Sequence, residues 1–361
     1  MNLAESIVLC CNILFCIPSL ASLTRFDYWW IRGFDFPRVQ ISILISANII
    51  AALIVYPFDN IWNYVMASLL VLSLIYQLVK IFPYTPLGKL QVIGYDGGPN
   101  EDNISILVSN VLMKNEAHEK LIDLVLSKEP DVFLTLESDK RWERALEPLE
   151  ESYGYCVKVP LDNRYGMHLY SKYPLENTKV KYLVEEDIPS IHSKLILQNG
   201  QKVSLHCLHP KPPSPSESKT STNRDAELLL VGKEIDNDAD LVLVCGDLND
   251  VAWSRTTKMF QKLSGLLDPR RGRGFFNTFH ADYRLLRWPL DHIFHSEDFT
   301  LMEINREKNI GSDHFPMYTK LNYTPKAEWQ QESPDASKEE EKWAREKIDK
   351  ADTADSDIDV K

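Results

Sequence analysis

The segment LVLVCGDLND, residues 241–250, ends an apolar run in side chains that can do chemistry. Asp247 and Asn249 are two residues apart, and we expect them on one face because side chains along a strand repeat with a period of two. A carboxylate at this point can bind a hard cation or orient and deprotonate a water molecule. The segment therefore predicts one half of a polar site at the end of a buried strand.

The same pattern recurs along the chain. Further apolar runs of strand length end in, or are directly preceded by, a polar side chain, and these side chains are Asn110, Glu137, His209, Asp291, Asp313 and His314. A single carboxylate at a strand end is usually a surface residue or a helix cap. Because strand ends in layered folds converge on one crevice, we expect this larger set to meet at one site.

The residue types in this set indicate a particular chemistry. The carboxylates of Glu137, Asp247 and Asp313, with the amide oxygens of Asn110 and Asn249, form an oxygen-rich set without sulfur. Such a set fits Mg²⁺ or Mn²⁺ better than Zn²⁺, and Mg²⁺ binds through few carboxylates plus substrate phosphate. Two histidines of the set remain for proton transfer near neutral pH. The combination predicts metal-assisted hydrolysis of a phosphoester.

The elements that position these residues form a layered domain. After a turn-rich linker over residues 91–101, apolar runs of strand length alternate with amphipathic stretches up to residue 325. Eight predicted strands and about four helices indicate an α/β domain over residues 102–325, with sheets covered by helices. His206 and His209 face opposite ways by strand alternation, which leaves His209 for the site. Cys207 and Cys245 fall in strand-like runs, and we expect buried, reduced thiols.

The order of these motifs resembles that of a known family. Asn110 is followed by LTLE, LHP, GDLND with WS, LDHIF and GSDHFP, which resembles the endonuclease/exonuclease/phosphatase family of the deoxyribonuclease I-like superfamily over residues 102–323. Membrane-anchored bacterial members look most similar. The resemblance implies a four-layer α/β sandwich with two mixed β-sheets and an active site at one edge. Leu136 stands where the family usually has Gln, and His292 where many members have Tyr.

The resemblance also implies roles for residues around the metal ion. Glu137 matches the main metal-ligand carboxylate, and Asn110 its neighbour in the metal site. Asp313 resembles a further acid of the metal or phosphate site. The expected ion is Mg²⁺ or Mn²⁺.

Five further residues carry catalytic roles by the same resemblance. Asp247 would orient or deprotonate the attacking water, and Asn249 would hold a phosphate oxygen. Asp291 and His314 match a carboxylate-histidine dyad, in which the carboxylate fixes the imidazole tautomer and supports its positive charge. His209 resembles a second histidine that contacts phosphate and is available as a general acid.

The first 90 residues have a different composition. Three stretches of 18 to 20 residues carry no charge: residues 6–23, 39–56 and 61–79. That length suits a bilayer core of about 30 Å, so we expect three membrane helices in a multi-pass protein of the inner or plasma membrane. A cleaved signal peptide is the alternative for the first stretch. Arg25, Arg32 and Arg38 place the domain in the cytoplasm by the positive-inside rule.

The tail over residues 326–361 holds 12 acidic and 7 basic residues and few apolar ones. KEEEKWAREKIDK has charged pairs four residues apart, which predicts a solvated, partly helical or disordered extension. A helix that binds a partner is the alternative. No protein partner is identified by the sequence.

The substrate is the least determined feature. Residues 91–325 hold 28 basic and 36 acidic side chains, whereas binding to duplex DNA usually rests on a basic surface. One basic cluster, followed by two more arginines, consists of Arg270, Arg271, Arg273, Arg284 and Arg287. This cluster suits a phosphate-rich substrate or an anionic headgroup, and the alternative is a solvated loop. We expect a membrane-anchored phosphoesterase acting on a lipid headgroup, nucleotide or nucleic acid. A metal-dependent nuclease and a noncatalytic membrane scaffold remain alternatives.

Overall fold

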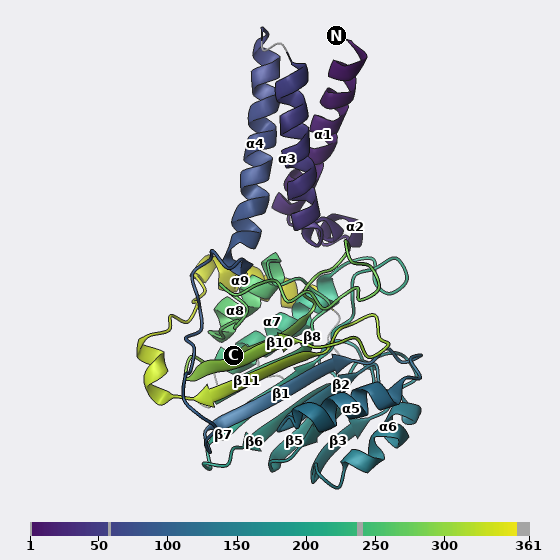
Figure 1. Cartoon of the computed structure of the whole chain (residues 1–361), viewed down its shortest axis with the longest axis vertical. Coiled ribbons are helices and arrows are strands. Elements are labelled where there is room, and N and C mark those ends of the chain that lie inside the picture. The colour runs from purple at the N-terminus through teal and green to yellow at the C-terminus, as the bar shows by residue number, and fades with distance from the viewer. Residues whose placement is uncertain (1, 57–58, 237–240, 352–361) are drawn as a thin grey trace.

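The N-terminal region forms a helical bundle that projects from a layered domain (Figure 1). The computed structural model describes residues 2–56, 59–236 and 241–351. Its helices α1 (Leu3–Leu23), α3 (Arg38–Val55) and α4 (Ile61–Ile81) lie side by side, with the short α2 (Trp29–Arg32) and η1 (Gly33–Asp35) between α1 and α3. Within the ranges that the structure describes, three segments are long and apolar enough to cross a membrane: Leu3–Leu23, Arg38–Val55 and Ile61–Tyr84. The three predicted apolar helices are therefore present.

The first sheet carries one pair of parallel strands at its centre. Its order is β10 (Phe299–Arg306), β11 (Met317–Tyr323), β1 (Asn103–Asn110), β2 (Val132–Leu136), β4 (Met167–Ser171) and β3 (Tyr155–Val159). Strands β1 and β2 are parallel, and the other neighbours are antiparallel. The carboxyl ends of β1 and β2 therefore lie at the same edge of the sheet.

The second sheet repeats this arrangement. Its order is β5 (Leu175–Lys181), β6 (Ser190–Ile196), β7 (Lys202–Leu208), β8 (Leu241–Asp247) and β9 (Asp291–His295). Only β7 and β8 are parallel, whereas β9 runs antiparallel to β8 and begins opposite its end. The ends of β7 and β8 and the start of β9 thus share one edge.

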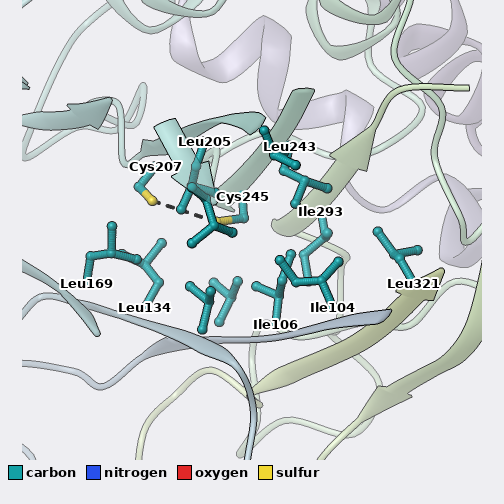
Figure 2. Close-up of a cluster of buried hydrophobic side chains, with 14 of the residues drawn as sticks. Ile104, Ile106, Leu134, Leu169, Leu205, Cys207, Leu243, Cys245, Ile293 and Leu321 are labelled. Atoms are coloured by element: carbon teal, nitrogen blue, oxygen red, sulfur yellow. Dashed lines mark hydrogen bonds between the residues drawn. The ribbon is translucent and has the colours of Figure 1, made fainter. Parts of the chain in front are cut away.

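The two sheets pack face to face through a buried apolar core (Figure 2). Figure 2 shows Ile106 and Leu134 of the first sheet facing Leu205 and Leu243 of the second. Cys207 and Cys245 belong to this core, and their sulfur atoms are 3.8 Å apart. Both cysteines are free and buried, as expected from the strand-like runs.

Helices cover both outer faces and complete a four-layer sandwich. On the first sheet lie α5 (His118–Lys128) and α6 (Lys140–Leu146), which continues into η3 (Glu147–Leu149). On the second sheet lie α7 (Thr222–Asp236), α8 (Arg255–Ser264) and α9 (Lys338–Ile348). The connecting 3-10 turns are η2 (Phe82–Tyr84) and η4 (Pro325–Trp329). The predicted sandwich with two mixed sheets is confirmed.

Three strands, β3, β5 and β10, escaped the sequence pattern. Each is an edge strand, and β5 is exposed along most of its length. Edge strands are often polar because exposed apolar edges promote aggregation. The sequence of β5, LENTKVK, therefore lacks the apolar run that identifies a central strand.

The tail helix α9 differs from the predicted solvated extension. Ala344 and Ile348 are buried in the cluster that α7 and α8 form over the second sheet. Lys347 is also buried, and its Nζ lies 3.0 Å from a carboxylate oxygen of Asp225 and in contact with Asp27. The tail therefore packs on the domain through residue 351, and residues 352–361 lie outside the described residues.

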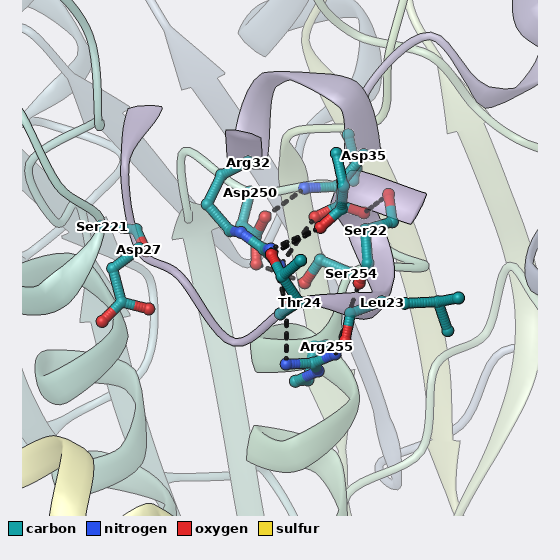
Figure 3. A network of polar contacts seen from close by, with 12 residues as sticks. Ser22, Leu23, Thr24, Asp27, Arg32, Asp35, Ser221, Asp250, Ser254 and Arg255 are labelled. Carbon is teal, nitrogen blue, oxygen red and sulfur yellow. Dashed lines mark hydrogen bonds and ion pairs between the residues drawn. The ribbon is translucent and has the colours of Figure 1, made fainter. Parts of the chain in front are cut away.

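The loop between α1 and α3 is hydrogen-bonded to the segment after β8 and to the residue before α7 (Figure 3). Arg255 Nη1 donates to the Thr24 carbonyl at 3.1 Å, and the Ser221 amide donates to the Asp27 carbonyl at 2.8 Å. Trp253 Nε1 donates to the Asp35 carbonyl at 2.7 Å. The helical bundle is thus joined to the segment that follows LVLVCGDLND.

Gly246 is required by the close approach of β7 and β8. Its φ is +146°, and a Cβ on this residue would lie 1.9 Å from the Leu208 carbonyl oxygen. Gly154 is exposed, and a Cβ there meets nothing within 4 Å.

We predict that Gly246→Ala lowers the free energy of unfolding by roughly 2–5 kcal/mol, because backbone must move to relieve the clash. Gly154→Ala should leave stability within about 0.5 kcal/mol of the parent chain. Near-ultraviolet circular dichroism of the detergent-solubilised protein during heating measures both. Equal melting temperatures for the two variants would contradict this role of Gly246.

Candidate active site

The sequence-predicted residues meet at one edge of the sandwich. Asn110 and Glu137 stand at the ends of β1 and β2, His209 follows β7, and Asp247 ends β8. Asp291 begins β9 in register with Asp247. In the turn before β11, Ser312 Oγ donates to the Asn110 carbonyl at 2.8 Å. This hydrogen bond places the next two residues, Asp313 and His314, at the same edge.

Asn110 links carboxylates of the two sheets. Its Nδ2 donates to Glu137 Oε1 at 3.0 Å and to Asp247 Oδ2 at 3.1 Å. Its Oδ1 accepts the amide N–H of Leu112 at 3.1 Å. The amide oxygen expected to bind the ion thus accepts one backbone hydrogen bond and keeps a second lone pair, while the amide nitrogen orients the two carboxylates.

Glu137 lies in a strongly acidic environment. Burial raises the pKa of its carboxyl group, and the neighbouring Asp313 and Asp247 raise it further against the opposing hydrogen bond from Asn110. Burial also raises the pKa of Asp247, as does Asp291. Ionising all of these groups together requires a compensating positive charge.

His314 supplies part of that charge. Its Nδ1 is 2.8 Å from Asp291 Oδ2, and its Nε2 is 3.5 Å from Asp247 Oδ2. Burial lowers the pKa of His314, but Asp291 and Asp247 outweigh it and raise the value to about 10. The imidazole is therefore protonated at neutral pH, between the two carboxylates, in the contact expected for the dyad.

His209 has the opposite electrostatic character. Its Nε2 is 3.9 Å from Asp247 Oδ2, which is too long for a direct hydrogen bond. Burial lowers the pKa of His209 to about 4, so the ring is neutral at pH 7. Within the described ranges, its buried Nδ1 has no hydrogen-bond partner. A neutral ring suits donation of one N–H to a bound anion.

Asn249 reaches the site for a different reason from the predicted one. It lies beyond the end of β8 and has a φ of +50°, so strand periodicity does not apply to it. Its amide N–H donates to Asp247 Oδ1 at 2.9 Å, which closes a tight turn. Its Nδ2 donates to the Pro210 carbonyl, and Arg224 Nη1 donates to its carbonyl at 2.8 Å.

These side chains line a pocket of about 350 Å³. Six predicted residues take part: Glu137, His209, Asp247, Asn249, Asp313 and His314. Asn110 and Asp291 support them from behind through the hydrogen bonds described above. The pocket also contains residues that the sequence did not single out, among them Phe36, Arg164, Tyr165 and Phe279. No strand-end pattern marks these four residues.

The basic cluster does not face the pocket as a phosphate-binding group. Arg270 is buried, where its guanidinium bonds both Asp268 oxygens, at 2.8 and 2.9 Å, and donates to the Asp291 carbonyl at 3.1 Å. Arg273 donates to the Pro269 and Val92 carbonyls. The proposed phosphate-receiving role is therefore wrong for Arg270, which instead fixes the backbone of Asp291.

His292 contributes to the same support. Its Nδ1 is 2.6 Å from Arg270 Nη2, and its Nε2 is 2.9 Å from the Asp250 carbonyl. Burial lowers the pKa of His292 to about 3, and Arg270 lowers it too. The neutral ring thus connects the loop after β8 to the start of β9, in the position where many relatives have Tyr.

The donor set fits a divalent cation. Glu137, Asp247, Asp291 and Asp313 gather around one protonated imidazole, so negative charge exceeds positive charge in a buried space. Carboxylate oxygens are the ligands that Mg²⁺ and Mn²⁺ take. Glu137 and Asp313 both line the pocket, and the negative charge of Asp313 acts on the Glu137 carboxyl group, so these two carboxylates are the better-suited pair.

A second grouping is less suited to the ion. Asp247, Asp291 and His314 each place a ligand atom within 4.8 Å of the others. However, His314 Nδ1 is bonded to Asp291, and a protonated imidazole has no lone pair for a cation. We therefore interpret this grouping as a hydrogen-bonded unit beside the ion rather than its ligand set.

We predict that Mn²⁺ or Mg²⁺ stabilises the folded chain, because the ion relieves repulsion present only in the folded state. Free ion at 100 times its dissociation constant should add about 2.7 kcal/mol. Glu137→Gln should remove most of this gain, whereas Glu119→Gln, on the exposed face of α5, should retain it. Thermal unfolding at increasing ion concentration measures the effect. An unchanged gain in Glu137→Gln would contradict the assignment of Glu137.

Solved structures share this architecture. The humanized D. rerio TDP2 is 17% identical, with 61% of this chain and 99% of that chain covered and a TM-score of 0.52. The human Nocturnin catalytic domain with bound sulfate anion is 17% identical, with 63% and 97% covered and a TM-score of 0.51. An endonuclease/exonuclease/phosphatase from Beutenbergia cavernae is 13% identical, with 62% and 72% covered and a TM-score of 0.50. These likenesses establish the fold.

No curated protein sequence matches the chain. The sequence profile of the Endonuclease/Exonuclease/phosphatase family, in contrast, matches residues 107–314, from β1 to the histidine of the dyad. This match covers more than half of the 361 residues and contains both sheets' site-bearing strand ends. The chain belongs to the endonuclease/exonuclease/phosphatase family.

Proposed function

We propose that this protein is a membrane-anchored, divalent-metal-dependent phosphoesterase that hydrolyses a phosphodiester or phosphomonoester with an activated water molecule. The observation that carries the proposal is the buried contact of Asp247 with the protonated His314 and Asp291 pair, beside an excess of carboxylates. Structural proteins gain little from such an arrangement, because buried like charges are costly unless they bind a ligand.

Mg²⁺ or Mn²⁺ is the proposed cofactor, held by Glu137 and Asp313. When bound, the ion would neutralise charge on a phosphate oxygen and help to orient the ester. Asn110 keeps Glu137 at its place through the 3.0 Å hydrogen bond and holds Asp247 by the same amide. Both carboxylates would then face the pocket in fixed positions.

Asp247 would accept a proton from, or orient, the attacking water. Its carboxylate is buried and fixed by Asn110 and by the Asn249 backbone. His314 would stabilise negative charge on the phosphoryl oxygens, with Asp291 fixing its ring. His209 and Asn249 would hold further phosphate oxygens. In-line attack on phosphorus needs little covalent chemistry, so positioning and charge neutralisation supply most of the rate.

The net acidic character of residues 91–325 supports a small phosphoester over a long nucleic acid. Retention of Glu137, Asp247 and His314 argues against a noncatalytic scaffold. The three apolar helices support membrane anchoring, and the basic residues near their domain-side ends support a cytoplasmic catalytic domain in the inner or plasma membrane.

We predict that Asp247→Asn and His314→Ala each lower kcat by about 10²–10⁴-fold, because each removes a group that acts on the reacting atoms. Chelation of divalent ions should abolish activity in the parent chain. Asp123→Asn, on the exposed surface of α5, should retain full activity. Release of phosphate or alcohol from a panel of phosphoesters is the measurement. Full activity in Asp247→Asn under chelation would refute the proposal.

We predict a cytoplasmic catalytic domain. A green fluorescent protein fused after residue 361 should fluoresce in a bacterial host, and alkaline phosphatase fused at the same point should be inactive. The opposite pair of results would show that the domain lies on the other side of the membrane.

A further inference from the structure

We propose that the loop over residues 280–287 contacts the lipid surface and that the pocket opens there, so that the hydrolysed phosphoester is carried by a membrane-resident amphiphile. This inference rests on the proposed function and names the substrate class of the same site. It assigns to the loop a role in reaching a substrate that stays in the bilayer.

The loop exposes large apolar side chains at its tip. Leu285 is 83% exposed, Tyr283 58% and Leu286 48%. Backbone hydrogen bonds from Leu286 to the Tyr283 carbonyl and from His280 to the Leu286 carbonyl hold the tip as a compact turn. A tight turn that presents adjacent leucines to solvent has no packing function within the domain. Such a patch marks a contact surface for an apolar partner.

The position of the loop identifies that partner as the bilayer. Gln40, in the first turn of α3, donates from Nε2 to the Leu285 carbonyl at 2.7 Å. Helix α3 is one of the three candidate membrane spans, and Gln40 stands near its domain-side end. The tip of the loop therefore lies beside the point where this span would leave the bilayer, at the membrane surface.

Aromatic residues at the same end of the bundle indicate the same boundary. Phe26, Tyr28, Trp29 and Trp30 follow α1 on the domain side, and all four are exposed. Tyr and Trp prefer the headgroup level of a bilayer, where the ring is apolar and its polar group stays hydrated. The loop and the aromatic segment thus both lie at the domain-side end of the candidate spans. A second protein or a second copy of this chain would have to displace lipid to reach the tip.

The two ends of the loop reach into the pocket. Phe279, just before it, and Leu290, just after it, both line the pocket. The ring of Phe279 lies 4.9 Å from the ring of His314, measured between centroids. The loop thus runs without interruption from the catalytic histidine to the membrane boundary.

The membrane region itself supplies a wall of the pocket. Phe36, between η1 and α3, lines the pocket, and its ring packs edge-on against Trp288 at 5.9 Å between centroids. An apolar wall that begins at a membrane helix suits the acyl or alkyl part of a lipid. A free sugar phosphate has no apolar group to place against it.

Charge at the loop and mouth suits an anionic headgroup. Arg284 is exposed between Tyr283 and Leu285, where it can meet lipid phosphates. Arg164 lines the pocket, keeps 65% of its side chain exposed, and forms an ion pair with Glu217 at 3.6 Å. The loop thus offers apolar side chains and a cation together, and the pocket offers a second cation.

Insertion of the loop is tested first. The full chain is placed in phosphatidylcholine nanodiscs with a genetically encoded dansylalanine at position 285, or at Leu126 of α5, which is 58% exposed, as the control. We expect blue-shifted emission at position 285 that doxyl-labelled phosphatidylcholine quenches, and water-like emission at position 126. Water-like, unquenched emission at position 285 would overturn the proposal.

The substrate class is tested with a double variant that combines Leu285→Ser and Leu286→Ser. Leu126→Ser serves as the control. The nanodiscs contain phosphatidylglycerol, sphingomyelin and phosphatidylinositol 4-phosphate, and bis(p-nitrophenyl) phosphate serves as the soluble ester. We expect the double variant to lose about tenfold or more in the rate on a lipid phosphoester, while its rate on the soluble ester stays within about twofold. The Leu126→Ser rates should equal those of the parent chain.

The other outcomes separate the two proposals. Hydrolysis of the soluble ester with no hydrolysis of any lipid, or equal lipid rates in the double variant and parent, would overturn the membrane-substrate inference and leave the phosphoesterase function standing. Absence of metal-dependent hydrolysis of every ester would overturn the proposed function, and the inference with it.

Discussion

The site depends on an imbalance of charge in a buried space. Four carboxylates, from Glu137, Asp247, Asp291 and Asp313, face one protonated imidazole, and burial raises the pKa of Glu137 and Asp247. Because the groups are largely buried, water screens this repulsion only weakly. A divalent cation would supply the compensating positive charge. This excess of negative charge favours binding of a hard divalent cation.

The fold creates this imbalance by bringing strand ends together. One parallel pair in each sheet, β1 with β2 and β7 with β8, places four strand ends at one edge. Asn110 then joins Glu137 of the first sheet to Asp247 of the second through a single amide. Behind it, buried Arg270 holds the Asp291 backbone, and Arg224 holds that of Asn249. Each arginine is paired with a buried carboxylate, Asp268 or Asp225, so neither adds net positive charge to the pocket, which stays acidic.

The sequence predicts the polar strand ends because a clear apolar run precedes each of these residues in the central strands. It missed the edge strands β3, β5 and β10, of which β5 is polar along most of its length. It placed Asn249 by strand periodicity, although its φ of +50° ends that periodicity. Arg270 appeared as a surface cation, because burial beside Asp268 depends on tertiary packing. Phe36 gave no signal at all, since its place in the pocket follows from how the membrane helices dock on the domain.

The central claim is that the carboxylates of Glu137 and Asp313 hold the metal ion while His314 stays protonated beside it. Electron spin-echo spectroscopy of the Mn²⁺-loaded full chain tests this directly, because coupling to nitrogen reports a bound imidazole. Our account predicts an oxygen-coordinated Mn²⁺ without histidine nitrogen coupling, and loss of the tightly bound signal in Glu137→Gln. A nitrogen coupling that disappears in His314→Ala would contradict it and assign the ion to the group formed by Asp247, Asp291 and His314.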